Sequence, residues 1–159
     1  MIGTDVAQVA SLLSQGQLVA IPTETVYGLA ANALDPQAVS EIYRVKNRPQ
    51  FNPLILHCAS IDDAKKYVKE WPEEARLLSN SFWPGSISFL LPKSALVPDL
   101  ITSGSSHVVI RVPNHPLTLD LLSRLDFPLA APSANISNTV SPTTAQHVES
   151  AIGSQIGYV

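Results

Sequence analysis

Apolar residues recur every three or four positions in the first segment of the chain, which predicts a helix. Over residues 6–13 they fall on one helical face, Asp5 or Thr4 can cap the start, and Gly16 can end it. The uninterrupted apolar run at 18–21 then predicts a short buried strand. The chain is therefore expected to begin with a helix that leads into a strand.

A second helix is expected over residues 36–45, because Asp35 followed by Pro36 is a strong start signal and the apolar positions keep helical spacing. Ser60 with Asp63 resembles a capping box and opens a further helix. The remaining patterns predict helices at 60–68, 72–82, 116–125 and 141–152, and strands at 53–58, 86–92, 107–112, 127–131 and 155–159.

Strands and helices alternate for much of the length, which favours a layered sheet covered by helices over a bundle or a sandwich. The strands at 86–92 and 107–112 are joined by a Pro- and Ser-rich stretch that is too irregular for a crossover helix. We therefore expect an α+β fold, an α/β layered arrangement around a mixed sheet. With 159 residues and no repeat or linker, residues 1–159 are expected to form a single domain.

Composition and charge narrow the possible functions. Only 14% of the residues are charged and the net charge is -3, which argues against a general nucleic-acid surface and leaves room for a local basic pocket. The single cysteine, Cys58, lies in an apolar run, so a buried thiol in a reducing compartment is the simplest interpretation. No segment has the pattern of a membrane anchor, and we expect a cytoplasmic protein.

The strongest candidate for chemistry is the basic segment from Lys46 to His57. Lys46 and Arg48 lie two residues apart directly before Pro49, and a second proline further on also keeps the segment out of regular helix. A guanidinium beside an ammonium at the boundary between two elements suits a polyphosphate or a carboxylate. On this stretch alone, a solvated basic turn that pairs with Glu41 is an equal alternative.

Arg111 is a second candidate, because a lone arginine near the end of a β-branched run needs a partner. That partner is a ligand carboxylate, a phosphate or a structural acid such as Asp120. Hydroxyl residues at 22–30 and a polar turn at 132–135 each follow a predicted strand, where ligand groups often lie. The common phosphate-loop, serine-nucleophile and zinc motifs do not occur in the sequence.

Four motifs, taken in order, resemble the YrdC family of threonylcarbamoyl-AMP synthases. They are PTETVYGLA at 22–30, K-x-R-P with N-P-L and a histidine at 46–57, V-I-R-V-P at 109–113 and S-A-N-x-S at 133–137. The resemblance runs from about residue 5 to the end of the chain. It implies an open, twisted, mixed β-sheet with flanking helices, YrdC/RibB-like in its fold, with a large concave cleft.

The resemblance implies a reaction in which L-threonine, bicarbonate and ATP give threonylcarbamoyl-adenylate and pyrophosphate, a nucleotidyltransferase step toward N6-threonylcarbamoyladenosine in tRNA. If the threonine amine captures CO2 as a carbamate, that carbamate can attack the α-phosphorus, so the protein mainly aligns and neutralises anions. Mg2+ is implied together with ATP, and no residue is expected as a metal ligand. The implied partners are downstream threonylcarbamoyl transferase proteins and tRNA or double-stranded RNA.

Carried onto this sequence, the resemblance assigns residues to three roles. The residues expected to line the nucleotide cleft and support catalysis are Lys46, Arg48, Ser133 and Asn135. The residues expected to hold threonine are Thr25, His57, Arg111 and Ser133. The residues expected near ATP are Arg48, Asn52, His107, Asn135 and Thr143. Each of them could instead have a local structural role, such as bonding nearby backbone or forming a turn.

The sequence departs from the family pattern in three places. His107 stands where the family usually has a small hydroxyl residue, and Asn138 stands where glycine often follows the S-A-N-x-S motif. The chain also stops at Val159, before a glycine pair and a Glu-Ser-Thr segment of the family, so the domain is expected to be truncated at its C-terminal end.

Two other functions stay open at this stage. One is a binding module that holds a nucleotide or structured RNA without turnover. The other is the carbamoyl-transferring domain of hydrogenase maturation proteins, which normally lies in a much longer chain with zinc-finger cysteines. The retained threonine-side residues favour the synthase, because an RNA-binding module would not require them.

Overall fold

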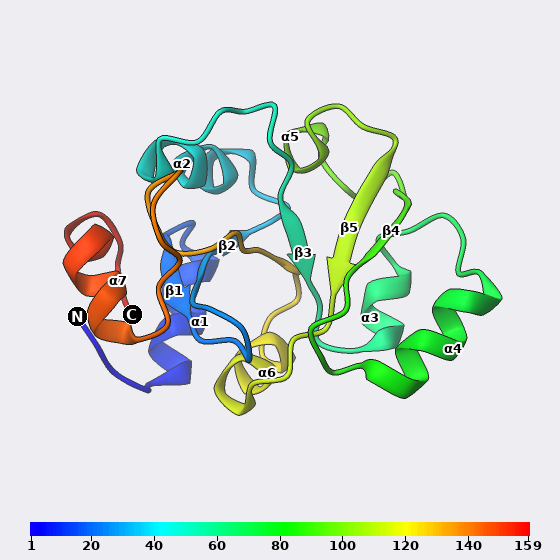
Figure 1. Cartoon of the computed structure of the whole chain (residues 1–159), viewed down its shortest axis with the longest axis horizontal. Coiled ribbons are helices and arrows are strands. Elements are labelled where there is room, and N and C mark those ends of the chain that lie inside the picture. The colour runs from blue at the N-terminus through cyan, green and yellow to red at the C-terminus, as the bar shows by residue number, and fades with distance from the viewer.

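The computed structural model describes residues 1–159 and contains one six-stranded mixed sheet with helices on both of its faces (Figure 1). The strand order is β1-β2-β6-β3-β5-β4, and only β3 and β5 run parallel to each other. The strands are β1 (Val19–Ile21), β2 (Gly28–Asn32), β3 (Ile55–His57), β4 (Phe89–Pro92), β5 (His107–Arg111) and β6 (Leu129–Ala130). The expected open, mixed sheet with flanking helices is confirmed.

The helices begin where the sequence supplies a cap or a first-turn proline. Asp5 accepts a hydrogen bond from the Gln8 amide at 3.0 Å, and Asp35 accepts one from the Gln37 amide at 2.9 Å. The helices are α1 (Val6–Ser14), α2 (Pro36–Lys46), α3 (Ile61–Lys65), α4 (Glu73–Phe82), α5 (Asp99–Thr102), α6 (Pro116–Ser123) and α7 (Ala145–Ile152), followed by the 3-10 turn Gly153–Gln155. None of them is long and apolar enough to cross a membrane.

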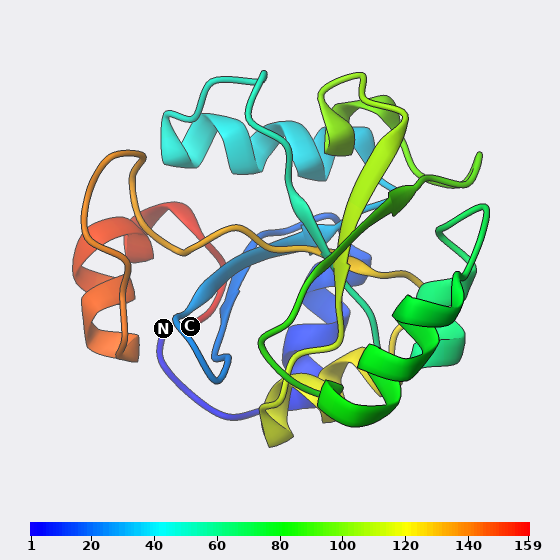
Figure 2. The same cartoon turned by 45° about the vertical axis from the view of Figure 1, so that its right-hand side comes forward.

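Two hydrophobic clusters cover the two faces of the sheet. Side chains alternate between faces along a strand, so Ala20 joins the larger cluster and its neighbours Val19 and Ile21 join the smaller one. The larger cluster takes its helical side chains mainly from α2, α5 and α7, and the smaller one from α1 and α6. Figure 2 shows α2 and α5 on one side of the sheet and α1 and α6 on the other.

Several expected elements differ from those observed. Strand β2 was not predicted, because Gly28–Asn32 is rich in small residues of low strand propensity and forms a strand only between β1 and β6. The helix expected at 60–68 ends at Lys65. The last helix begins after Thr144, whose side chain accepts from the His147 amide, and not at 141. A short helix, α5, lies in the irregular stretch before β5.

The C-terminal residues lie along the free edge of β1. The strand expected at 155–159 is reduced to an isolated parallel bridge between Val19 and Tyr158. The Ala20 amide donates to the Tyr158 carbonyl at 2.8 Å, and the Gly3 amide donates to the Val159 carbonyl at 3.0 Å. Both ends of the chain therefore meet beside β1, as Figure 1 also shows.

The packing of the sheet predicts very different effects for two neighbouring positions. Ile110 on β5 is fully buried in the larger cluster, whereas Leu90 on the edge strand β4 is 65% exposed. We expect Ile110→Ala to lower the free energy of unfolding by about 2 to 5 kcal/mol because it leaves a cavity. Leu90→Ala should change it by less than about 0.5 kcal/mol. Urea denaturation of both variants measures the difference, and similar losses would contradict the described burial.

Candidate functional site

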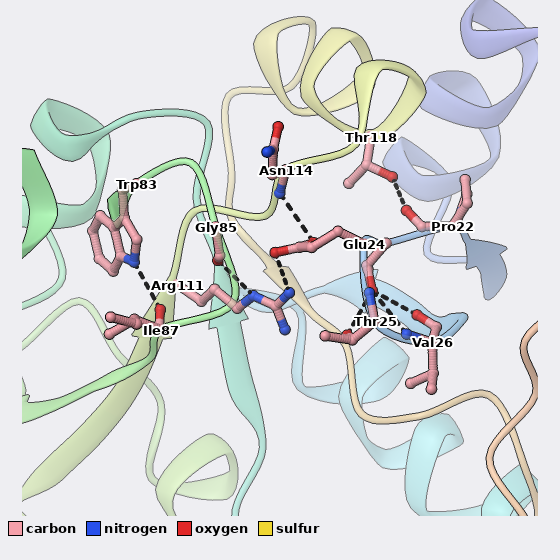
Figure 3. Close-up of polar contacts among 11 residues, drawn as sticks. Pro22, Glu24, Thr25, Val26, Trp83, Gly85, Ile87, Arg111, Asn114 and Thr118 are labelled. Atoms are coloured by element: carbon pink, nitrogen blue, oxygen red, sulfur yellow. Dashed lines mark hydrogen bonds and ion pairs between the residues drawn. The ribbon is translucent and has the colours of Figure 1, made fainter. Parts of the chain in front are cut away.

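The first part of the site is the turn between β1 and β2, which Thr23 organises. The Thr23 hydroxyl accepts hydrogen bonds from the amides of Thr25 and Val26, each at 3.2 Å, and donates to the Val26 carbonyl at 2.6 Å. The Thr25 hydroxyl lies 2.9 Å from that of Thr23 and is exposed (Figure 3). The backbone of this turn is thus bonded by Thr23 and not by the Thr25 side chain, whose hydroxyl stays at the surface.

His57 and Arg111 form the second part of the site, where two parallel strands end side by side. They are direct partners in the β3–β5 register, so both side chains project from the same face of the sheet. His57 is also paired with Leu129, which belongs to the cluster under α1 and α6. Two positions earlier on the same two strands, Ile55 and Val109 project from the same face and are only half-buried. The helices therefore leave part of this face uncovered next to His57 and Arg111.

Arg111 is held by a structural acid, and that acid is Glu24. The Arg111 Nη2 atom lies 2.5 Å from Glu24 Oε1, although its angular approach does not meet hydrogen-bond geometry, so the contact is an ion pair. The Arg111 Nε atom donates to the Gly85 carbonyl at 3.1 Å (Figure 3). The partner suggested by the sequence was wrong, because Asp120 pairs instead with Arg124, one helical turn away on α6.

His57 is buried and carries no charge at neutral pH. Burial, and secondarily the nearby charge of Arg111, lowers its pKa to about 4. Its Nδ1 atom lies 3.4 Å from the Ile55 carbonyl. A neutral imidazole with so low a pKa is a poor proton acceptor, so this geometry suits positioning better than acid–base chemistry.

The third part of the site is the end of α2, where the helix delivers its basic residues. Asn47 adopts a left-handed conformation with φ of 48°, and the amides of Asn47 and Arg48 bond the Arg44 and Tyr43 carbonyls. This Schellman arrangement ends the helix and turns the chain sharply. Lys46 is thus the last helical residue and Arg48 the first of the loop, which corrects the expectation that both lie in one loop.

Lys46 is a buried ammonium that binds backbone. Only 1% of the residue is exposed, and its Nζ atom donates to the Ser133 carbonyl at 2.5 Å and the Asn135 carbonyl at 2.6 Å. Two of its three N–H groups are therefore used, and one remains. Burial, followed by repulsion from Arg48, lowers the Lys46 pKa to about 8. The ammonium connects α2 to the S-A-N turn.

Arg48 lies in a loop that hydrogen bonds hold at several points. Its Nε and Nη2 atoms donate to the carbonyls of Asn52 and Pro53 at 3.4 and 3.2 Å. The Asn52 carbonyl also accepts from the Tyr43 hydroxyl at 3.1 Å. Glu41, suggested as the acid for a simple basic turn, pairs with Arg44 at 2.7 Å. Arg48 therefore has no acidic partner.

The S-A-N turn carries buried oxygen atoms without partners. The Asn135 side-chain amide donates to the Ile136 and Thr139 carbonyls at 2.9 and 2.8 Å, but its Oδ1 atom is buried without a hydrogen bond. The hydroxyl of Ser137 is likewise buried and unpaired. Buried polar atoms are normally satisfied, so two such atoms on one turn indicate a place for a ligand or water.

These residues line a common cavity of about 450 Å³, large enough for a small-molecule ligand. Its wall is mostly polar, and it is bounded by the basic loop on one side and the S-A-N turn on the other. The lining residues are Lys46, Arg48, Pro49, Phe51, Asn52, Ser133, Asn135, Ser137, Asn138, Thr139 and Ser141. The expected nucleotide-cleft set is thus brought together.

The distribution of charge makes this cavity distinct from the rest of the surface. The chain has ten basic residues, and seven of them form ion pairs with nearby acids, namely Arg44, Lys65, Lys66, Arg76, Lys93, Arg111 and Arg124. The three without an acidic partner are Lys46, Arg48 and Lys69, and the first two line the cavity. Uncompensated positive charge is therefore concentrated at one place, which favours an anionic ligand there.

Backbone contacts join the 22–30 segment to the S-A-N turn. The Ala134 amide donates to the Tyr27 carbonyl at 2.8 Å, and the Tyr27 amide donates to the Pro142 carbonyl at 2.9 Å. Gly28 forms an isolated antiparallel bridge with Ser133. The turn that carries Thr25 and the wall of the cavity are thus one connected structure.

Two predicted ATP-side residues lie outside the cavity. His107 is exposed at the start of β5, the opposite end of the strand from Arg111, and its ring contacts the Ser106 hydroxyl at 3.0 Å. Thr143 is exposed and lies 3.5 Å from the His147 ring, beside a second cavity of about 270 Å³ that shares Asn135 with the first. Their contact with ATP stays a prediction.

Sequence reasoning assigned no individual role to four residues of the site. Thr23 and Glu24 lie in the recognised 22–30 segment, but nothing local indicates that one shapes the turn and the other reaches Arg111. Ser137 was available as the last position of S-A-N-x-S. Phe51 is 77% exposed beside Arg48, and its position between two prolines was the available signal.

The amino-acid sequence of this chain is similar to a protein family and to several curated proteins. Residues 11–159 match the sequence profile of the Sua5/YciO/YrdC family, described as telomere recombination. The threonylcarbamoyl-AMP synthase of Pyrococcus abyssi is 52% identical over 87% of this chain, which covers 41% of that protein. The synthase of Vibrio vulnificus is 34% identical over 98% of this chain, which covers 85% of that protein.

A solved structure is also closely similar. The crystal structure of P. abyssi Sua5 complexed with L-threonine superposes with a TM-score of 0.94 at 48% identity, over 96% of this chain and 45% of that one. The chain thus spans about four-tenths of the length of the first curated relatives, from 38% to 42%.

The buried state of Lys46 predicts a pH-dependent stability. Its pKa is about 8 in the folded chain and 10.5 without burial, so between these values the unfolded chain binds a proton that the folded chain has lost. The stability of the wild type should therefore rise with pH across this window, and should fall as pH drops toward 8. Urea denaturation of the wild type and Lys46→Met at several pH values isolates the effect.

Lys69→Met is the matched control, because Lys69 is exposed and also lacks an acidic partner. The free energy of unfolding of Lys69→Met should differ from that of the wild type by a constant amount over the same pH range. A constant difference for Lys46→Met as well would show that Lys46 is not titrating in a buried site.

Proposed function

This chain belongs to the Sua5/YciO/YrdC family, and we propose that it is a threonylcarbamoyl-AMP synthase, a nucleotidyltransferase that uses L-threonine, bicarbonate and ATP. The observation that carries the proposal is the pairing of two charged regions on one connected scaffold. Lys46 and Arg48 line a polar cavity of about 450 Å³, and Arg111 lies at the end of β5 beside His57 and opposite the turn of Thr25.

In the proposed reaction, threonine and bicarbonate form a carbamate with loss of water. A carbamate oxygen then bonds to the α-phosphorus of ATP while the bond to pyrophosphate breaks, so the products are threonylcarbamoyl-adenylate and pyrophosphate. No protein nucleophile is required. The protein accelerates such a step by aligning the two anions and offsetting the charge that they bring together.

The nucleotide is assigned to the cavity between the basic loop and the S-A-N turn. Arg48 has no acidic partner, and its Nη1 atom makes no hydrogen bond, so it can face phosphate oxygens. Lys46 adds positive charge, but its main contacts are the carbonyls of Ser133 and Asn135, so its role is chiefly to position the turn. The unpaired oxygens of Asn135 and Ser137 would gain partners from the ligand.

Threonine is assigned to the region of Arg111, His57 and Thr25. Support comes from the similar P. abyssi structure, which is a complex with L-threonine. In this chain the Arg111 side chain is only 9% exposed, so a carboxylate that reaches it would be largely shielded from water. The neutral ring of His57 can pack against the amino acid without repelling its ammonium group.

Mg2+ is proposed to enter with ATP as part of the substrate. The cavity offers hydroxyl and amide oxygens, including the unpaired Asn135 Oδ1 atom, which suit a hydrated Mg2+ held mainly by phosphates. No group of three or more histidine, cysteine, aspartate or glutamate side chains is placed to bind a metal. Bound Mg2+ would supply further neutralisation of the phosphates.

RNA binding without turnover is the second candidate, and the charge distribution disfavours it. Seven of the ten basic residues are paired with acids and the net charge is -3, so a broad surface for phosphates is missing. Delivery of the product to tRNA is proposed to depend on downstream threonylcarbamoyl transferase proteins. A carbamoyl-transferring activity would need no threonine, so a requirement for threonine in turnover separates it from the synthase.

The proposed synthase predicts pyrophosphate release that depends on both threonine and bicarbonate, because the attacking group is the carbamate that they form together. The protein is mixed with ATP and Mg2+, either substrate is omitted in turn, and pyrophosphate and the AMP-linked product are followed. ATP alone should be inert. Release without threonine would contradict the synthase and favour another phosphoryl reaction, whereas binding of RNA without any release would favour the second candidate.

Arg48 should contribute to nucleotide affinity. We expect Arg48→Ala to weaken ATP binding by about 1.5 to 3 kcal/mol, the scale of a hydrogen bond to a charged group, with little change in melting temperature. Calorimetric titration with ATP and Mg2+ measures the loss. Lys69→Ala is the matched control, because Lys69 is exposed, lacks an acidic partner and lies outside the cavity. Equal ATP affinities for the two variants would remove Arg48 from the site.

A further inference from the structure

We propose that Glu24 is a positioning residue for the amino-acid substrate, because it fixes the guanidinium of Arg111 so that one edge stays free for a carboxylate. The inference rests on the proposed function and adds a residue to it. Glu24 lies in the turn between β1 and β2, whereas Arg111 lies at the end of β5 (Figure 3). The contact therefore joins strands that are not neighbours in the sheet.

The contacts of Arg111 define which of its N–H groups are used. Nε donates to the Gly85 carbonyl at 3.1 Å, and Nη2 lies 2.5 Å from Glu24 Oε1. These partners occupy the lateral edge of the guanidinium. Figure 3 shows the other terminal nitrogen directed away from Glu24 with no marked contact. The Nη1 group and the outer hydrogen of Nη2 are thus left for a ligand.

Glu24 is itself held in place, so it can orient Arg111. Its Oε2 atom accepts a hydrogen bond from the Asn114 amide at 3.0 Å, just beyond β5, and the turn around it is fixed by the Thr23 hydroxyl. Burial acts to raise the pKa of Glu24, but the adjacent Arg111 guanidinium and backbone hydrogen bonds outweigh it and keep the pKa below its ordinary value. The carboxylate is therefore charged at neutral pH.

The position of the Glu24–Arg111 ion pair differs from that of an ion pair that contributes only to stability. The Glu24 side chain is 22% exposed and Arg111 is 9% exposed, so the pair lies at the margin of the interior and not within it. Arg111 Nη2 is buried without a well-formed hydrogen bond, which leaves bonding capacity at the guanidinium. Next to it lie Thr25, adjacent to Glu24 in the chain, and His57, the register partner of Arg111. Two residues assigned to threonine thus flank the Glu24–Arg111 ion pair.

The test is Glu24→Gln, which keeps the size and one acceptor but removes the charge that orients Arg111. We expect threonine affinity to fall by about 10- to 100-fold, the scale of one charge-assisted hydrogen bond, while ATP affinity changes less than about twofold. In turnover, KM for threonine should rise and kcat at saturating threonine should stay within about threefold, because the reacting atoms are not touched. Glu24→Asp, which retains the charge, should recover part of the affinity.

Controls separate positioning from loss of structure and from failure of the proposed function. Asp120→Asn removes an exposed ion pair on α6 and should leave both affinities unchanged. In an Arg111→Gln background, Glu24→Gln should cause no further loss of threonine affinity, because Glu24 acts through Arg111. Melting curves check folding, and if Glu24→Gln does not fold, Glu24→Asp carries the test through its threonine KM.

The outcomes are distinguishable. Wild-type protein that binds no threonine would overturn the proposed function together with this inference. Wild-type protein that binds threonine, beside a folded Glu24→Gln variant that binds it equally well or more tightly, would overturn the inference alone. A raised KM for both threonine and ATP would also overturn it, because that result describes general loosening of the site.

Discussion

The candidate site depends on one buried ammonium. Lys46 ends α2, is almost fully enclosed, and donates hydrogen bonds to the carbonyls of Ser133 and Asn135, nearly ninety residues away in the chain. Removing a charge from water is costly, and the two carbonyls provide only partial compensation, which is why the pKa of Lys46 is lowered. The contact fixes the S-A-N turn against the basic loop, so the cavity between them has a defined shape.

A second constraint is the compensation of charge elsewhere on the molecule. Five of the ten basic residues pair with an acid three or four positions away in the chain, as Arg76 does with Glu73. Such exposed pairs add little to stability, but they cancel much of the positive field of the surface. What remains uncompensated lies mainly at the cavity. An anion is therefore attracted to one place, in a protein whose net charge is negative.

The two halves of the site are related by the sheet. The parallel pair β3 and β5 places His57 and Arg111 side by side, and the β1–β2 turn brings Glu24 to Arg111 across the intervening strands. Strand β2 begins at Gly28, and an isolated bridge between Gly28 and Ser133 joins this strand to the S-A-N turn. The residues proposed for threonine and those proposed for the nucleotide are thus joined through the pairing of the sheet and the Glu24–Arg111 ion pair.

The sequence by itself determined the local elements and the candidate residues. Caps such as Asp5 and Asp35, and helical periodicity, depend on neighbours within a few positions, so they could be read directly. The four motifs indicated the family, and from them followed the expected nucleotide-cleft residues Lys46, Arg48, Ser133 and Asn135, which all line the cavity. Strand β2 could not be found in this way, because its small residues have no strong preference and pair only when β1 and β6 flank them.

Tertiary structure alone decided the partners of Arg111 and Lys46. Arg111 pairs with Glu24 and not with Asp120, because the fold brings the β1–β2 turn to the end of β5 while Asp120 faces Arg124 on its own helix. Lys46 lines the cavity, but two of its N–H groups bind backbone carbonyls, because the end of its helix is packed under the S-A-N turn. Ion-pair and hydrogen-bond partners that are far apart in the chain depend on which segments meet in space. The local sequence pattern does not indicate which segments these are.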